Sequence, residues 1–342
     1  MTDKKKLTLK DIAKALNLSV STVSRALKAH PDIANETIEL VKKYAEDNHY
    51  VPNLMAVNFR KSRTYNLGLI VPEIVHHFFS TVISGAICEA NGQGYNILVT
   101  QSNDILNVEE KASQIMLNGS VDGLLISISN ETTTGEHLQA FLDEGKPVVQ
   151  FDKITDYISC PKVIVDDFEG AYQATKHLID QGYTRIAHIR GRTDVKNACD
   201  RYEGYLKALK DAGMPIREDL VKCCTMITED EGYNFTSELM QNDNPPDAIF
   251  CITDLVAFGS LKYLKENGYV VPNQIGLMGF SNWMISQTTT PTMSTVNQYG
   301  YEMGRAATKL LLQLIKDQDL DRADTTILKT ELIIRESSMK QK

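Results

Sequence analysis

The chain lacks the short motifs that mark many enzymes. No strand-like segment is followed by GxGxxG or GxxxxGKS/T, which argues against a nucleotide cofactor, and neither GxSxG nor HExxH occurs. The histidines at positions 76, 77, 137, 177 and 188 are scattered, and we interpret them as surface or core-edge groups rather than metal ligands. We therefore predict a protein that is not an enzyme and that uses no cofactor and no metal.

Paired cysteines and long apolar runs are also missing. The six cysteines form no CxxC pair, and most lie in or beside apolar runs, which is typical of reduced thiols in a cytosolic protein. No run approaches the length of a membrane span, and the first residues lack the apolar core of a signal peptide. These absences predict a soluble cytoplasmic protein without a membrane partner.

Charge is distributed unevenly over the 342 residues, a length that predicts two or three domains. The net charge is −8, but residues 1–63 carry 12 Lys or Arg against 7 Asp or Glu, a net of +5. The remainder carries 24 against 37, a net of −13. A basic head on an acidic body is typical of a small nucleic-acid module attached to a domain that avoids nucleic acid.

Residues 8–28 have the pattern of two short helices joined by a tight turn. Apolar residues at i, i+3, i+4 and i+7 form one stripe on the first helix: Leu9, Ile12, Ala13 and Leu16. Thr8 and Asp11 have the form of an N-terminal cap, and Ser19 can cap the second helix. On that second helix, Val20, Val23 and Leu27 are predicted to point inward.

The outward face of the second helix carries small hydroxyls and positive charge: Ser21, Ser24, Arg25 and Lys28. Such side chains suit a base edge and its flanking phosphates. One interpretation is therefore a helix-turn-helix whose second helix lies in the major groove of DNA. The alternative is an ordinary pair of antiparallel helices with a solvated polar face.

A third helix is predicted over residues 34–48, with Ile38, Val41 and Ala45 inward. Residues 54–63 then combine a short apolar run with three basic positions. A segment this short cannot hold a helix in water, but it can fold on binding and insert an apolar wedge into a minor groove. A plain flexible linker is the alternative.

From residue 67, apolar runs of strand length alternate with helical windows. The first set of expected strands is 67–71, 96–100, 123–128 and 147–151, with helices near 79–93, 108–118 and 136–144. The second set is 163–165, 185–189, 221–224, 248–252 and 275–280, with helices near 168–181, 198–212, 230–241 and 254–267. A late helix (302–315) and a terminal strand (326–334) are expected to return across the lobe boundary. The alternation predicts two doubly wound α/β lobes with parallel sheets and a small-molecule site at the strand ends.

Three motifs occur in order along the chain: Thr8-Leu-x-Asp-Ile-Ala-x-x-Leu-x-Leu-Ser-x-x-Thr-Val-Ser-Arg25, Tyr50-x-Pro-Asn53 and Ile275-x-Leu-Met-Gly-Phe280. With them, nearly the whole chain resembles the LacI/GalR (lactose-repressor/galactose-repressor) family of bacterial transcription regulators. The resemblance implies an α + α/β fold: a three-helix helix-turn-helix head, a hinge helix, and a two-lobed doubly wound body resembling periplasmic sugar-binding proteins.

The domain boundaries that follow are a DNA-binding head at 1–50, a hinge helix or linker at 51–66, an effector-binding and dimerisation body at 67–338, and a polar tail at 339–342. Within the body, the N-lobe is expected at about 67–164 and 294–325. The C-lobe is expected at about 165–293 and 326–338.

The resemblance also implies DNA-contacting residues. Thr8 and Thr22 would hold phosphates, and Arg25 is the donor expected to reach guanine. The full implied set is Thr8, Ser19, Val20, Ser21, Thr22, Arg25, Tyr50, Asn53, Ala56 and Phe59. Phe59 stands where relatives carry a wedging leucine, so we hypothesise that Phe59→Ala abolishes tight operator binding and leaves the fold intact; unchanged operator affinity would refute the wedge role.

For the ligand, the implied set is Phe78, Phe79, Asp152, Lys153, Asn197, Arg201, Thr253, Asp254, Ser281 and Gln298. Core packing is the alternative for the two phenylalanines, and a helix cap is the alternative for Asp254. Relatives have Gly-Phe-Asp-Asp where this chain has Gly279-Phe-Ser-Asn-Trp283, so the carboxylate that would hold sugar hydroxyls is absent. A neutral sugar and an acidic one, held by Arg201 and Lys153, both stay open.

The expected partners are double-stranded DNA with a pseudo-palindromic operator, a small carbohydrate-like effector, and a second copy of the chain. The short polar tail lacks leucine heptads, which favours a dimer over a tetramer. Ligand binding would rotate the lobes and order or melt the hinge segments, so the two sites would be linked in free energy. The alternatives are a ligand-binding receptor without DNA function and, disfavoured by the missing motifs, a sugar-processing enzyme.

Overall fold

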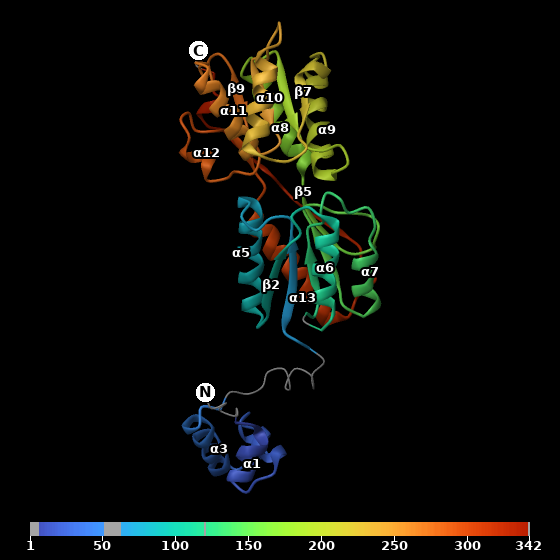
Figure 1. The fold of residues 1–342 in the computed structure, drawn as a ribbon, viewed down its shortest axis with the longest axis vertical. Coiled ribbons are helices and arrows are strands. Elements are labelled where there is room, and N and C mark those ends of the chain that lie inside the picture. The colour runs from blue at the N-terminus through green and yellow to red at the C-terminus, as the bar shows by residue number, and fades with distance from the viewer. Residues whose placement is uncertain (1–6, 51–62, 120, 341–342) are drawn as a thin grey trace. The chain divides into compact units, whose positions relative to one another are not determined.

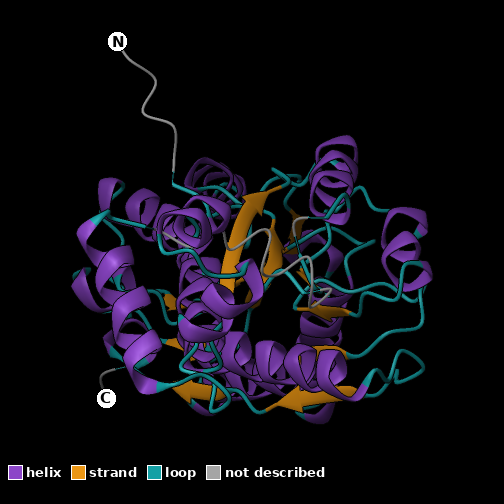
Figure 2. Cartoon of the chain, turned by 90° about the horizontal axis from the view of Figure 1, so that it is seen from below, coloured by secondary structure: helices purple, strands orange, loops and turns teal. Residues whose placement is uncertain are grey.

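The computed structural model describes residues 7–50, 63–119 and 121–340, which fall into two compact units divided between residues 64 and 65. Helices form much of the chain, as the purple ribbons of Figure 2 show. Within the described ranges, no helix combines the length and apolar character needed to cross a membrane.

The first unit consists of helices packed around one small core. They are α1 (Leu9–Ala15), α2 (Val20–Ala26) and α3 (Asn35–Asp47). The buried apolar residues are Ile12, Ala13, Val23, Ala26, Ile38, Val41 and Ala45, which confirms the inward faces predicted for the first and third helices. The inward prediction for Val20 is wrong: it is 38% exposed, because it is the first residue of α2 and the core begins one turn later.

The second unit begins with a lobe built on a six-stranded parallel sheet in the order β11-β5-β4-β3-β1-β2. Figure 1 shows this lobe with its helices around the sheet. Its strands are β1 (Asn66–Val71), β2 (Asn96–Gln101), β3 (Leu124–Ile126), β4 (Val148–Phe151), β5 (Lys162–Val165) and β11 (Thr325–Leu328). Two helices, α5 (His77–Gly92) and α13 (Gly300–Asp317), cover one face. The other face is covered by α6 (Leu106–Leu117) and α7 (Glu136–Asp143).

The second lobe has a four-stranded parallel sheet in the order β7-β6-β8-β9. Its strands are β6 (Ile186–Arg190), β7 (Val221–Cys223), β8 (Ala248–Cys251) and β9 (Gly276–Met278). The helices α8 (Asp167–Asp180) and α9 (Lys196–Asp211) share one core, and α10 (Glu229–Met240) and α11 (Asp254–Glu266) share the other. The smaller elements are α12 (Ile285–Thr288), the antiparallel pair β10 (Thr295–Asn297) and β12 (Glu331–Ile333), and the 3-10 turns Glu218–Leu220 and Glu336–Ser338.

The sequence pattern assigns two strands to the wrong place. It puts residues 163–165 with the second lobe, but β5 pairs with β4 and β11 in the first sheet. It also predicts one strand over 326–334, but the chain changes lobes there, so β11 joins the first sheet and β12 pairs with β10. Residues 294–297, which were predicted in the N-lobe, therefore lie with the C-lobe. Residues 326–328, which were predicted in the C-lobe, lie in the sheet of the N-lobe. Apolar periodicity reports burial and does not say which sheet a strand joins.

Over residues 121–340 the chain passes between the lobes three times: after β5, between β10 and α13, and between β11 and β12. Two of these passages touch, because the Thr330 hydroxyl donates to the Asp166 carbonyl oxygen at 3.3 Å. The carboxyl ends of the strands of both sheets carry the loops that hold most of the predicted ligand residues.

Candidate functional site

The outward face of α2 is ordered by its own hydroxyls. Ser19 Oγ accepts a hydrogen bond from the Thr22 backbone N–H at 3.0 Å, which caps the helix. It also lies 2.7 Å from the Ser21 hydroxyl and 2.8 Å from the Thr22 hydroxyl. Ser21 and Arg25 are exposed one turn apart. A capped helix therefore presents an arginine and small hydroxyls to solvent, as a major-groove reading helix requires.

The two ends of the head have different roles in the structure. Thr8 and Asp11 form a reciprocal capping box, in which Asp11 Oδ2 accepts from the Thr8 backbone N–H at 2.9 Å. Tyr50 is half-buried against the head core, and burial raises the pKa of its hydroxyl. Asn53, Ala56 and Phe59, the predicted hinge contacts, lie outside the described residues.

In the second unit, two predicted ligand residues from different lobes meet. The Asn197 side-chain amide at the start of α9 donates to Asp152 Oδ1, after β4, at 3.2 Å. Asp152 has a positive φ of 57° and is buried. Burial raises the pKa of Asp152, and the positive charges of Arg201 and Lys153 oppose that rise.

Lys153 is held within its own lobe. Its Nζ donates to both carboxylate oxygens of Asp104, at 2.8 and 3.0 Å. Asp104 Oδ1 also accepts the Asn130 backbone N–H at 3.2 Å, so one carboxylate joins the loops after β2, β3 and β4. The lysine charge at this edge of the sheet is thereby compensated.

Arg201, predicted to grip the effector, is 4% exposed and fully engaged. Its Nε donates to Asp167 Oδ1 at 2.8 Å, and its Nη1 donates to the Ile252 carbonyl oxygen at 2.8 Å. The guanidinium lies 3.9 Å from the centre of the Phe280 ring. Sequence reasoning missed Asp167, although its place two residues after β5, at the first position of α8, was a signal that could have found it. Burial raises the pKa of Asp167 to about 6, although the arginine charge opposes this.

Thr253 and Asp254, at the start of α11, have different roles. Thr253 is the helix cap, since its hydroxyl accepts the Val256 N–H at 3.4 Å. Asp254 accepts the Thr295 hydroxyl and the Trp283 backbone N–H, each at 2.6 Å, with one oxygen apiece. Burial raises the pKa of Asp254 to about 6, while these hydrogen bonds lower it. Asp254 is therefore neither the cap nor free to bind a ligand as it stands.

The remaining predicted ligand residues are dispersed. Phe78 and Phe79 lie in the core of the first lobe, 4% and 6% exposed, with their rings edge-to-face at 5.3 Å. Ser281 is half-buried with a φ of 121°, and Gln298 is 3% exposed at a lobe crossing. The fold thus brings together Asp152 with Asn197 and leaves the two phenylalanines in a packing role.

Sequence reasoning missed three buried polar atoms at the carboxyl edge of the first sheet. His76 Nδ1, Ser102 Oγ and Asn130 Oδ1 have no hydrogen-bond partner among the described residues. They follow β1, β2 and β3, which are neighbours in the sheet. Burial, together with the nearby positive charge of Lys153, lowers the pKa of His76 to about 4, so the imidazole is neutral near pH 7. Unpaired buried polar atoms are costly, and a ligand is one way to satisfy them.

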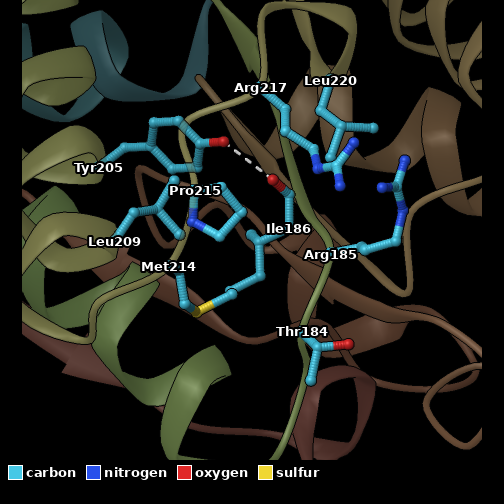
Figure 3. A pocket seen from close by; sticks show the side chains of 9 residues that line it. All are labelled: Thr184, Arg185, Ile186, Tyr205, Leu209, Met214, Pro215, Arg217 and Leu220. Carbon is cyan, nitrogen blue, oxygen red and sulfur yellow. Dashed lines mark hydrogen bonds between the residues drawn. The ribbon is translucent and has the colours of Figure 1, made fainter.

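A small hollow lies at the opposite, amino end of the second sheet (Figure 3). Its lining residues are Thr184, Arg185, Ile186, Tyr205, Leu209, Met214, Pro215, Arg217 and Leu220. The Tyr205 hydroxyl donates to the Ile186 carbonyl oxygen at 2.8 Å beside it. None of the predicted ligand residues lines this hollow, so it is separate from the site at the strand ends.

A helix-turn-helix head joined to a body of two parallel α/β lobes defines a class of protein, the DNA-binding regulators with a ligand-binding body. Residues 8–53 match the family described as bacterial regulatory proteins, lacI family. Residues 64–336 match the periplasmic binding proteins and sugar binding domain of the LacI family. The chain belongs to the LacI family. It is a DNA-binding transcription regulator with a ligand-binding domain and is not an enzyme.

Full-length relatives agree with this assignment. The chain is 31% identical over 332 residues to the NTD biosynthesis operon regulator NtdR of Bacillus subtilis (strain 168), covering 97% of this chain and 99% of the relative. The transcriptional regulator CelR–cellobiose complex is 28% identical with a TM-score of 0.73, covering 97% and 100%. The Lac repressor dimer bound to operator and the anti-inducer ONPF has a TM-score of 0.86 at 20% identity, covering 98% and 100%, and shows the fold alone.

Proposed function

We propose that this protein is a cytoplasmic, homodimeric repressor of transcription that binds a pseudo-palindromic operator. We further propose that a neutral, hydroxyl-rich small molecule, a sugar or sugar derivative, controls its operator affinity from the strand ends between the two lobes. One observation supports a neutral ligand: at those strand ends Lys153 and Arg201 are paired with carboxylates, whereas several buried neutral polar atoms have no hydrogen-bond partner among the described residues.

Three of the positive charges near the site are already paired. Lys153 is bound to Asp104 at 2.8 Å, Arg201 to Asp167 at 2.8 Å, and Arg192 to Asp194 at 2.6 Å. An acidic ligand held by Lys153 and Arg201 would have to displace both carboxylates, leaving at least one of them, Asp167, buried without its partner. The pairing of Lys153 and Arg201 therefore favours a neutral ligand over an acidic one held by these two residues.

The polar atoms without partners are neutral and can bind hydroxyls. His76 Nδ1, Ser102 Oγ and Asn130 Oδ1 offer an imidazole, a hydroxyl and an amide oxygen, whose hydrogen-bonding capacities match those of sugar hydroxyls. Half-buried Trp283 adds an aromatic face in the loop after β9. The solved relative that carries cellobiose supports the same class of ligand.

Two exposed edges support the homodimer. β2 is an edge strand of the first sheet, and Leu98 on it is 38% exposed. β7 is an edge strand of the second sheet, and Met226 just after it is 67% exposed. Apolar side chains on uncovered edge strands are sites where a second chain packs. Two copies would place two α2 helices on a two-fold symmetric operator.

The test is isothermal titration calorimetry of the full chain against cellobiose, ribose, adenosine and glucuronate. We expect at least one neutral compound to bind and glucuronate not to bind. Ser102→Ala should then lower the affinity for that compound about three- to tenfold, which corresponds to the loss of one hydrogen bond. Ser113→Ala is the matched control, because Ser113 Oγ is also buried and unpartnered but lies on α6.

Binding of glucuronate alone would overturn the neutral-ligand proposal. Equal losses in the Ser102 and Ser113 variants would show that Ser102 does not contact the ligand.

A further inference from the structure

The 281–283 loop, which follows β9, has an unusual backbone. Ser281 has a φ of 121° and Asn282 a φ of 49°, so two consecutive residues other than glycine take left-handed conformations. Such conformations persist only where the surroundings hold them, and they gather at functional positions. The contacts around the loop supply that support.

Asp254 holds the loop from one side. Its Oδ2 accepts the Trp283 backbone N–H at 2.6 Å, and its Oδ1 accepts the Thr295 hydroxyl at 2.6 Å. The Asn282 backbone N–H in turn donates to the Thr295 hydroxyl oxygen at 3.1 Å. One buried carboxylate therefore fixes the backbone of the loop to β10.

Arg335 holds the loop from the other side. Its Nη2 donates to Asn282 Oδ1 at 2.8 Å, and its Nη1 donates to the Met293 carbonyl oxygen at 2.8 Å and to Ser286 Oγ at 3.0 Å. The loop is thus braced by two charged side chains and has no ionised group of its own.

The braced loop presents the indole of Trp283 to the first lobe. Its ring stacks on the ring of His77, with centroids 6.1 Å apart and planes 21° from parallel. His77 is the first residue of α5, and both side chains are half-buried. Burial lowers the pKa of His77, so the imidazole is mainly neutral near pH 7 and packs as an aromatic ring.

We propose that Trp283 and His77 form an aromatic clasp between the two lobes, presented by the 281–283 loop, and that this clasp favours their closed arrangement. Asp254 and Arg335 are positioning residues for it. A ligand that binds the closed arrangement benefits from the clasp, because the clasp raises the population of that arrangement, so the ligand's affinity depends on the two rings. That last consequence rests on the proposed function, whereas the clasp itself does not.

The chain carries a single tryptophan, so fluorescence excited at wavelengths that tyrosine does not absorb reports on Trp283 alone. The experiment measures acrylamide quenching of the full chain without ligand. In His77→Ala the quenching constant should rise about twofold, as the indole loses its cover, and His77→Phe should restore the wild-type value. His49→Ala, in the head, is the matched control. Equal quenching in all four proteins would overturn the clasp.

A second arm uses calorimetry with whichever of cellobiose, ribose or adenosine binds. Trp283→Ala should lose about two- to tenfold in affinity, the range one aromatic pair is worth, and Trp283→Phe should lose less. Circular dichroism melts confirm that each variant is folded. Wild-type affinity in Trp283→Ala would overturn the link to the ligand. If no compound binds, the proposed function fails and the quenching arm alone decides the clasp.

Discussion

Arg201 and Asp167 form an ion pair in which each side chain is only 5% exposed. Removing one partner of such a pair leaves a buried charge without compensation, which is more costly than removing both. We predict that Arg201→Met lowers the free energy of unfolding by about 3–5 kcal/mol. The double variant Arg201→Met with Asp167→Leu should recover most of that loss. Urea unfolding of the three proteins measures this, and additive losses would contradict it.

The raised pKa of Asp254 predicts that the stability of the protein depends on pH. Its pKa in the folded chain is raised to about 6, above the unfolded value near 3.9. The folded state therefore holds the proton more tightly, and the stability this gives is complete below about pH 4 and lost as the pH rises to about 6. Relative to Asp254→Asn, wild type should lose on the order of 1–3 kcal/mol between pH 4 and pH 7.

Urea unfolding of the two proteins at several pH values measures the difference. Asp167 has a raised pKa of the same sign, but it is present in both proteins and cancels. A wild-type stability that rose with pH relative to the variant would contradict the assignment.

The roles of single residues were predictable where a motif fixes both the residue type and its position on a helix. The exposed Ser21 and Arg25 follow from the helix-turn-helix spacing, and the caps at Thr8 and Ser19 follow from local pattern. The Trp283–His77 contact was not predictable, because the two residues lie on different lobes and only the folded chain brings them together. The unpartnered atoms after the strands were hidden for the same reason.

At the scale of elements, α5 and α13 pack at backbone distance. A Cβ on Gly304 would lie 2.0 Å from the Val82 carbonyl oxygen. We predict that Gly304→Ala lowers the free energy of unfolding by about 1–3 kcal/mol through overpacking. Gly92→Ala, at the last residue of α5, meets nothing within 4 Å and should be neutral or slightly stabilising. Denaturant unfolding of the pair checks this, and equal effects would refute the close-packing argument.

The elements themselves were largely predictable, because each lobe alternates buried strands with amphipathic helices. What the pattern left out is connectivity. β5 and β11 have the apolar character of any buried or edge strand, and only their pairing places them in the first sheet. Val20 shows that apolar periodicity is less reliable at a helix end, because a position that fits the pattern can lie outside the core.

At the scale of the whole molecule, the exposed edge of the first sheet predicts self-association. Leu98 lies on the edge strand β2, and Ile327 lies on β11 at the opposite edge, 60% exposed. Leu98→Lys should shift the chain toward monomer in analytical ultracentrifugation, because a buried charge opposes the interface. Ile327→Lys tests the opposite edge in the same way, and loss of the dimer in that variant alone would place the interface at β11. A dimer undisturbed by Leu98→Lys would place the interface elsewhere.

We expect the head to read a DNA sequence under the control of a ligand bound in the body. Selection of bound DNA from a random pool tests this, followed by fluorescence anisotropy of the selected sequence with and without the ligand found by calorimetry. We predict a two-fold symmetric sequence whose affinity changes about 5- to 150-fold with ligand, and whose base preference relaxes in Arg25→Lys. Binding without sequence preference, or an affinity that no bound ligand alters, would contradict the account.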